Sequence, residues 1–177
     1  YFSSQATFEM VVTNCNTGRA EYLTEKSGDR QRLLDICRAS SSLPYVSKVI
    51  DVDGLPYLDG GIVDSIPVQR AIDMGHERNV LVLTRNRGYR NTSRDRKIPR
   101  FIYKKYPRLR VALSRRIAEY NRQLEMVEDM EDRGIVDVIR PQRPMDVGRM
   151  EKDEKKLEAL YEEGFVLGEQ FCQSKVS

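Results

Sequence analysis

A carboxylate followed by two glycines, Asp59-Gly60-Gly61, stands at the end of a predicted hairpin strand and restricts the fold more than any other feature. The hairpin strands, residues 46–52 and 55–58, flank Asp53-Gly54, a dipeptide that tolerates the positive φ angles of a tight turn. Glycines lower backbone crowding at a strand end, where ligands meet α/β sheets. Asp59 is therefore a candidate general base, although a carboxylate that caps a turn explains the same pattern.

The residues before this hairpin predict a second hairpin and a helix. An almost continuously apolar run at 7–13 and a short strand at 20–23 are joined by turn residues. Asp29 is predicted to cap a helix over residues 30–38. The core side of this helix is predicted to carry Leu33, Leu34 and Cys37. Ser40, Ser41 and Ser42 end the helix and lack flanking glycines, which indicates capping rather than a nucleophile.

Beyond Asp59 the pattern is helix and then buried strand. A short helix at 68–74 is ended by Gly75, and a fully apolar strand follows at 80–84. This alternation predicts an α/β fold. From residue 85 onward the predicted elements are a basic loop at 85–97, one long helix at 107–133, a strand at 135–139 and a final helix at 151–173. We therefore predict two parts, residues 1–84 and a mainly helical extension over 85–177.

Charge is distributed unevenly along the chain. The 177 residues carry a net charge of +3, but residues 85–122 contain 14 basic and only 2 acidic side chains. The basic residues that alternate with Phe101, Tyr103 and Tyr106 are Arg100, Lys104, Lys105, Arg108, Arg115 and Arg116. They predict contact with an anionic lipid surface or with nucleic-acid phosphates. The alternative is a solvated helix face whose arginines pair with acidic residues, notably those at 151–163.

Other kinds of chemistry have little support in the sequence. The three cysteines, Cys15, Cys37 and Cys172, are widely spaced, which indicates a reducing compartment, and Cys15 and Cys37 are interpreted as small core residues. His76 is the only histidine and lies in a predicted surface turn, so neither a zinc site nor a catalytic triad is expected. Asp51, Asp53, Asp59 and Asp64 do not have the spacing of a calcium loop. We expect no metal and no cofactor, and no apolar run is long enough to cross a bilayer.

Several segments together resemble the second half of a patatin-like phospholipase. They are Arg38–Pro44, Tyr57–Gly61 and Asp64–Val68. Residues 80–89 and 147–153 are similar to the bacterial branch of that family with its C-terminal extension. The resemblance implies part of a three-layer α/β sandwich followed by a helical extension.

The resemblance also implies a reaction. Patatin-like enzymes hydrolyse acyl esters of lipids with a Ser/Asp dyad, in which the serine of Gly-x-Ser-x-Gly attacks the carbonyl and the aspartate accepts its proton. By resemblance Asp59 is that aspartate, and Gly60 and Gly61 let the backbone pass close to the site. A lipid hydrolase suits a membrane surface better than nucleic acid, so we expect a cytoplasmic protein that is peripheral at the membrane.

The chain departs from the family pattern in one respect. It contains no Gly-x-Ser-x-Gly and no glycine-rich oxyanion segment, and its first residue is Tyr1. We therefore expect a C-terminal fragment that is inactive alone and whose partner is the upstream half of the same protein. The competing hypothesis, from another functional class, is a non-catalytic module that binds anionic lipid or nucleic acid through residues 85–122.

Overall fold

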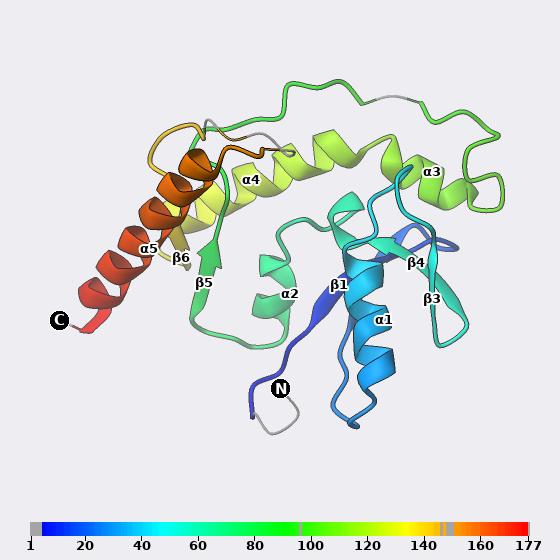
Figure 1. Ribbon diagram of the computed structural model, residues 1–177, viewed down its shortest axis with the longest axis horizontal. Helices are drawn as coiled ribbons and strands as arrows, with labels where there is room; N and C mark the ends of the chain where they lie inside the picture. Colours follow the sequence, from blue (N-terminus) through cyan, green and yellow to red (C-terminus); the bar gives the residue numbers. More distant parts are fainter. Residues whose placement is uncertain (1–4, 96, 146, 148–150, 177) are drawn as a thin grey trace. The chain divides into compact units, whose positions relative to one another are not determined.

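The structure, a computed structural model, describes residues 5–95, 97–145, 147 and 151–176, and it divides the chain into two compact units (Figure 1). The first unit comprises residues 1–67 and 91–123, and the second comprises residues 68–90 and 124–177. The boundary predicted between residues 84 and 85 stays a prediction. Part of the segment 147–153 that resembles the bacterial branch lies outside the described residues.

The centre of the first unit is a four-stranded antiparallel sheet in the order β2-β1-β4-β3. Its strands are β1 (Met10–Asn14), β2 (Arg19–Leu23), β3 (Ile50–Val52) and β4 (Leu55–Asp59). Both predicted hairpins are confirmed, although β3 is shorter than expected. Asp53 and Gly54 have φ angles of 55° and 79°, as a two-residue turn between twisted strands requires.

Helix α1 (Arg30–Ser40) covers one face of this sheet. The predicted cap is confirmed, because the Asp29 carboxylate accepts a hydrogen bond from the backbone N–H of Arg32 at 3.0 Å. Ile36 and Ala39 are fully buried, and they pack with buried side chains of the strands: Met10, Val12, Val52 and Tyr57. The prediction that Leu34 lies on the core side of this helix is wrong. Its side chain is 52% exposed, because the buried side of the helix is centred on Ile36.

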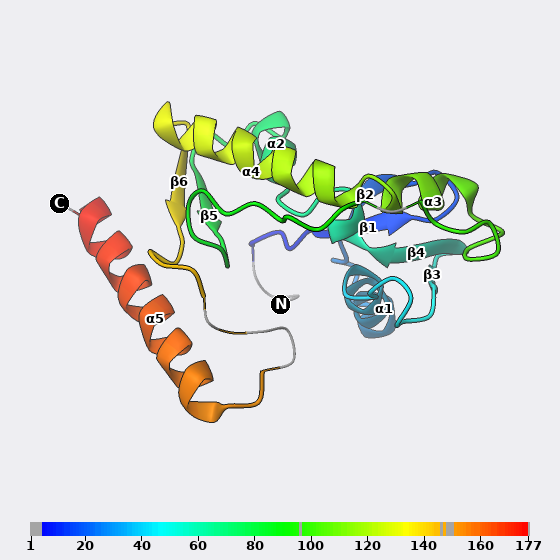
Figure 2. The same cartoon turned by 90° about the horizontal axis from the view of Figure 1, so that it is seen from above.

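Helix α3 (Pro107–Leu113) packs on the opposite face, so that the sheet lies between two helical layers (Figure 2). Successive side chains of a strand point to opposite faces, and Leu58 accordingly joins Cys15 and Leu109 in this second core. All three are fully buried. The α/β sandwich implied by the resemblance is therefore confirmed, together with a helical C-terminal part.

The prediction of a single helix over residues 107–133 is wrong in one respect. The chain forms α3 and then α4 (Arg116–Asp132), with a break between them. The Ser114 hydroxyl donates a hydrogen bond to the carbonyl of Val111 at 2.8 Å. Side-chain hydroxyls of this kind compete with the helical backbone pattern, and the chain turns at this residue.

The second unit contains a two-stranded parallel sheet and two further helices. Its elements are α2 (Val68–Asp73), β5 (Asn79–Val82), β6 (Val136–Ile139) and α5 (Glu154–Val176). Gly75, with a φ of 85°, follows α2 as predicted. The expectation that β5 is a buried strand is wrong. Val82 is 74% exposed, because β5 pairs only with β6 among the described residues. No helix in the described part of the chain is both long and apolar enough to span a membrane.

A buried carboxylate in the first unit makes its stability depend on pH. Glu25 accepts hydrogen bonds from the Ser27 hydroxyl and from the Arg32 guanidinium, and these bonds lower its pKa from 4.5 to about 2. A depressed pKa contributes stability that is fully present above pH 4.5 and is lost as the pH falls towards 2.

We expect Glu25→Gln to unfold at a lower urea concentration than the wild type at pH 7, because the ion pair with Arg32 is lost. The difference in unfolding free energy between the two proteins should shrink below pH 4.5 and vanish near pH 2. Urea titrations of both proteins at several pH values measure this difference in unfolding free energy. A difference that stays constant with pH would contradict this account.

Candidate functional site

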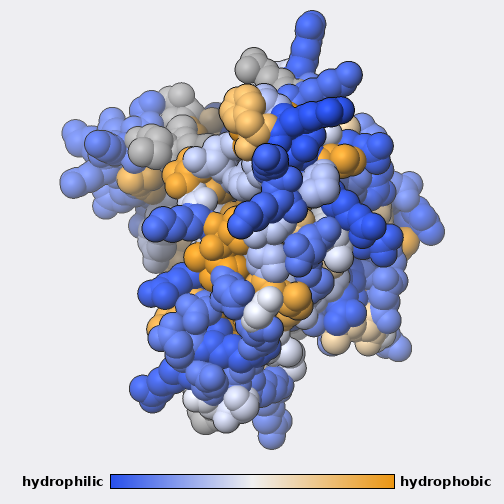
Figure 3. Space-filling model, turned by 90° about the vertical axis from the view of Figure 1, so that its right-hand side faces the viewer, coloured by the Kyte–Doolittle hydropathy of each residue, from blue (hydrophilic) through white to orange (hydrophobic). Residues whose placement is uncertain are grey.

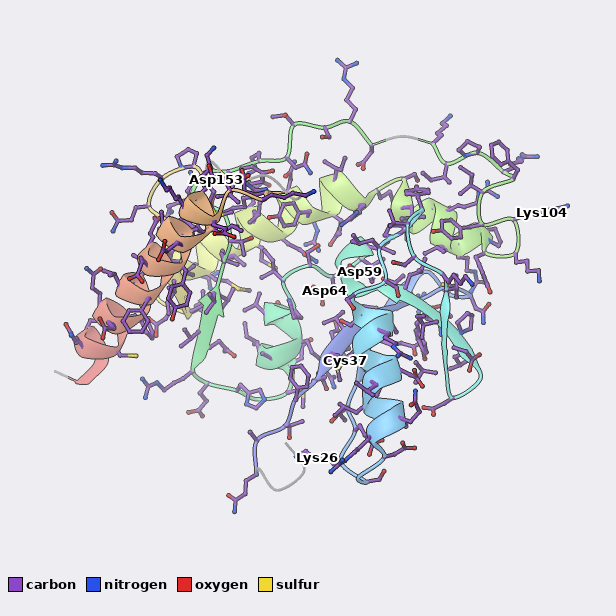
Figure 4. All side chains as sticks on the ribbon, viewed as in Figure 1. Lys26, Cys37, Asp59, Asp64, Lys104 and Asp153 are labelled. Atoms are coloured by element: carbon purple, nitrogen blue, oxygen red, sulfur yellow. The ribbon has the colours of Figure 1, made fainter. Side chains whose placement is uncertain are left out.

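Asp59 is the last residue of β4, and its backbone is held from two sides. Its N–H donates to the carbonyl of Ser42 at 3.0 Å, and its own carbonyl accepts from the Thr13 hydroxyl at 2.8 Å. The side chain is half-buried. Figure 4 shows Asp59 at the end of β4 and Asp64 in the turn that follows. Both neighbours of the Asp59 backbone come from other parts of the chain, so the position of its carboxylate is fixed by the fold.

The two oxygens of the Asp59 carboxylate have different surroundings. Oδ1 accepts the backbone N–H of Gly61 at 2.7 Å, which caps the short 3₁₀ helix η1 (Gly60–Ile62). Oδ2 has no hydrogen-bond partner among the described residues. Asp59 thus caps a turn with one oxygen, as one interpretation of the sequence held. Its other oxygen can still accept a proton.

Gly60 and Gly61 have separate structural roles. A Cβ atom at Gly60 would lie 2.4 Å from the carbonyl oxygen of Val11, a distance that no side chain tolerates. A Cβ atom at Gly61 would lie 3.0 Å from Oδ1 of Asp59. Gly60 therefore brings β1 and the end of β4 into close contact, and Gly61 supplies the N–H that orients the carboxylate.

Residues of α4 hold the turn after Asp59. The Gln123 side-chain oxygen accepts the N–H groups of Ser65 and Ile66 at 3.0 and 3.2 Å. Its amide nitrogen donates to Asp64 at 3.1 Å, and the Arg116 guanidinium donates to the carbonyl of Gly61 at 3.1 Å. Gln123 is only 5% exposed. Nothing in the local sequence indicates Gln123, because its partners lie almost 60 positions earlier.

The alternative nucleophiles and triad members behave as ordinary structural residues. The hydroxyls of Ser40, Ser41 and Ser42 donate to the backbone carbonyls of Val11, Cys37 and Arg38, respectively. The contacts of Ser41 and Ser42 are capping contacts at the end of α1, as predicted, whereas Ser40 bonds to strand β1. His76 is exposed and belongs to the second unit, whereas Asp59 belongs to the first.

The predicted basic residues divide into groups. Arg100, Lys104 and Lys105 are exposed in the turn before α3. Arg108 and Arg115 line a pocket of about 390 Å³, beside Arg19, Ile62 and Val63, and Asp59 is not among its lining residues. Arg116 is half-buried against Gly61. The six residues therefore do not act as one uniform surface.

Other arginines of the basic segment have acidic partners in α4. Arg87 pairs with Glu131 and Asp132, and Arg90 pairs with Glu125 and Glu128. The bonds from Arg90 and from the N–H of Gly88 lower the pKa of Glu128 to about 2. The predicted pairing with acids is thus present, but these partners come from α4 and not from residues 151–163.

Comparison with known proteins identifies two segments of the chain. Residues 3–72 match the family model described as patatin-like phospholipase, and residues 106–175 match a domain of unknown function (DUF6363). The first part of the chain is therefore similar to patatin-like phospholipases. The site at Asp59 lies inside the matched residues.

One curated relative has a similar sequence. The uncharacterized protein YjjU of Escherichia coli (strain K12) is 41% identical over 56 residues. The match covers 31% of this chain and 16% of the length of that protein. The name of this relative describes no activity.

We expect Gly60→Ala to destabilise the first unit by about 1–3 kcal/mol, because the added methyl group must displace the backbone of Val11. Gly61→Ala is the matched control, since its methyl group meets only side-chain atoms of Asp59 and Ser65 and should cost less. Thermal unfolding followed by circular dichroism compares them. Equal losses would show that the close approach at Gly60 is unimportant.

We expect Gln123→Ala to lower the unfolding free energy by about 1–3 kcal/mol, because it leaves the N–H groups of Ser65 and Ile66 without their acceptor. Gln31→Ala is the control. Gln31 is exposed on α1 and bonds only to Asp35, so its loss should stay within about 0.5 kcal/mol. Denaturant titrations of both variants test whether α4 holds the turn.

Proposed function

We propose that Asp59 is the general base of a patatin-like acyl hydrolase that cleaves lipid acyl esters. The observation that carries this proposal is that the two carboxylate oxygens of Asp59 differ. Oδ1 accepts the N–H of Gly61, and Oδ2 has no hydrogen-bond partner among the described residues. A base needs a fixed orientation and a free acceptor atom, and Asp59 has both. The position of Asp59 within the patatin-like residues 3–72 supports the same role.

The 177 residues contain no Gly-x-Ser-x-Gly, so the proposed dyad takes its serine from a segment outside this sequence. In the acylation step Asp59 Oδ2 accepts the serine proton while the serine oxygen attacks the ester carbonyl. Collapse of the tetrahedral intermediate breaks the bond to the alcohol, which leaves with the proton from Asp59. Water then attacks the acyl-serine, with Asp59 again accepting the proton, and the fatty acid and free serine are regenerated. Backbone N–H groups for the oxyanion are assigned to the same segment that supplies the serine.

A non-catalytic module that binds polyanions through residues 85–122 has less support. Arg87, Arg90 and Arg122 already pair with acidic residues, and Arg116 bonds to the Gly61 carbonyl. These contacts leave fewer cations for phosphate groups than the sequence indicates.

The test is hydrolysis of a short p-nitrophenyl ester by a protein that contains both this chain and a segment with Gly-x-Ser-x-Gly. We expect Asp59→Asn to lower kcat by roughly 10²–10⁴-fold, because the amide oxygen still accepts the Gly61 N–H but the side chain no longer accepts a proton. Asp73→Asn, which changes an exposed aspartate of α2, should leave the rate unchanged. Equal rates for Asp59→Asn and the wild type would remove Asp59 from the mechanism.

A further inference from the structure

Two turns of the first unit expose large apolar side chains at their tips. Val46 is 83% exposed, Phe101 is 80% exposed and Tyr45 is 57% exposed. Single exposed apolar residues are normal on soluble proteins. These three, however, are contributed by only two short segments, residues 43–49 and 99–106.

The two segments are joined to one another by a pair of tyrosines. The backbone N–H of Tyr45 donates to the Tyr103 hydroxyl at 2.8 Å, and the two ring centroids lie 5.9 Å apart. Both tyrosines have positive φ angles, 70° for Tyr45 and 50° for Tyr103. Aromatic residues rarely adopt this conformation, and such strained positions are concentrated at functional sites. The apolar tips therefore belong to one surface.

Basic residues flank the apolar and aromatic residues of segment 99–106. Arg100 precedes Phe101, and Lys104 and Lys105 follow Tyr103. These three side chains are exposed and form no salt bridge among the described residues. The two segments contain no Asp or Glu. Lys104 extends outward at the right-hand edge in Figure 4, and Figure 3, which views the molecule from that side, shows hydrophobic side chains grouped among hydrophilic ones.

This surface is connected to the candidate base. Segment 43–49 begins directly after Ser42, whose carbonyl accepts the N–H of Asp59. The Arg116 guanidinium donates a hydrogen bond to the carbonyl of Gly61. Its positive charge also acts on Tyr45: burial raises the pKa of the Tyr45 hydroxyl, and Arg116 partly opposes that rise. The exposed turn and the residues around Asp59 are therefore neighbours in the first unit.

We propose that Tyr45, Val46 and Phe101 insert into the headgroup region of an anionic lipid bilayer while Arg100, Lys104 and Lys105 contact its phosphates. Exposed apolar side chains next to exposed cations match the two layers of a lipid surface, with hydrocarbon below and phosphate above. Nucleic acid would match the cations but would leave Val46 and Phe101 exposed to water. We call these six residues the lipid-docking surface.

The choice of a lipid partner rests on the proposed function, in which lipids are the substrate. Vesicle binding is measured without turnover, so the two proposals can fail separately. A protein that binds vesicles but does not need Asp59 would disprove the role of the base alone. One that needs Asp59 for ester hydrolysis but does not bind vesicles would disprove the docking surface alone.

Insertion can be detected by fluorescence, because the 177 residues contain no tryptophan. We expect the emission of Val46→Trp and of Phe101→Trp to shift to shorter wavelength when vesicles of phosphatidylcholine and phosphatidylglycerol are added. Leu34→Trp, at an exposed apolar position on α1, is the matched control and should show no shift. An unshifted emission at both test positions, or an equal shift in the control, would overturn the proposal.

The role of charge is tested by cosedimentation with the same vesicles. We expect Lys104→Gln/Lys105→Gln to weaken binding by about fivefold for each charge removed, and added salt to weaken wild-type binding. Lys152→Gln/Lys155→Gln removes the same charge from the second unit and should bind like the wild type. Equal weakening by both pairs, unchanged binding of the first pair, or binding to an oligonucleotide without binding to vesicles would each overturn the proposal.

Discussion

The close contact between Gly60 and Val11 is the constraint on which the rest of the site depends. Only a hydrogen atom fits between these two backbone segments, so β1 can approach the chain where β4 ends. That approach lets the Thr13 hydroxyl reach the Asp59 carbonyl and lets the chain turn into η1. The N–H of Gly61 then meets the carboxylate. A carboxylate oriented by a backbone N–H in this way keeps its other oxygen free of partners among the described residues.

The helical extension contributes to the first unit more than a linear division of the chain indicates. Residues 106–175 match a separate family model, yet α3 and the first part of α4 belong to the same compact unit as the patatin-like residues. Leu109 completes one core of the sheet, and Gln123 binds the turn after Asp59. The patatin-like segment and the beginning of the extension therefore share one compact unit, in which Gln123 of the extension bonds to the turn that follows the candidate site.

Features that depend on neighbouring residues could be predicted from the sequence, and features that depend on distant partners could not. The Asp53-Gly54 turn and the Asp29 cap follow from local backbone chemistry, and both are present. The exposure of Leu34 and of β5 depends on which elements pack against them, which periodicity does not reveal. The sequence predicts the position of Asp59 at a strand end. The hydrogen bonds of Asp59 with Ser42 and Thr13, and those of Gln123, join residues far apart in the sequence, so only the folded structure reveals them.

The segment between Ser42 and β3 has a geometric consequence for a lipid hydrolase. Ser42, the residue before this segment, is bonded to Asp59, and Tyr45 and Val46 lie exposed at the surface a few positions later. The Ser42–Asp59 bond and the Tyr45–Tyr103 contact hold this short stretch of chain at two points. A base that accepts a proton during attack on a membrane lipid must lie close to the lipid surface. Tyr45 and Tyr103 have positive φ angles, which aromatic residues do not favour. In the proposed function, the need to place the base near the lipid surface sets the shape of this turn, and the backbone preference of the two tyrosines does not.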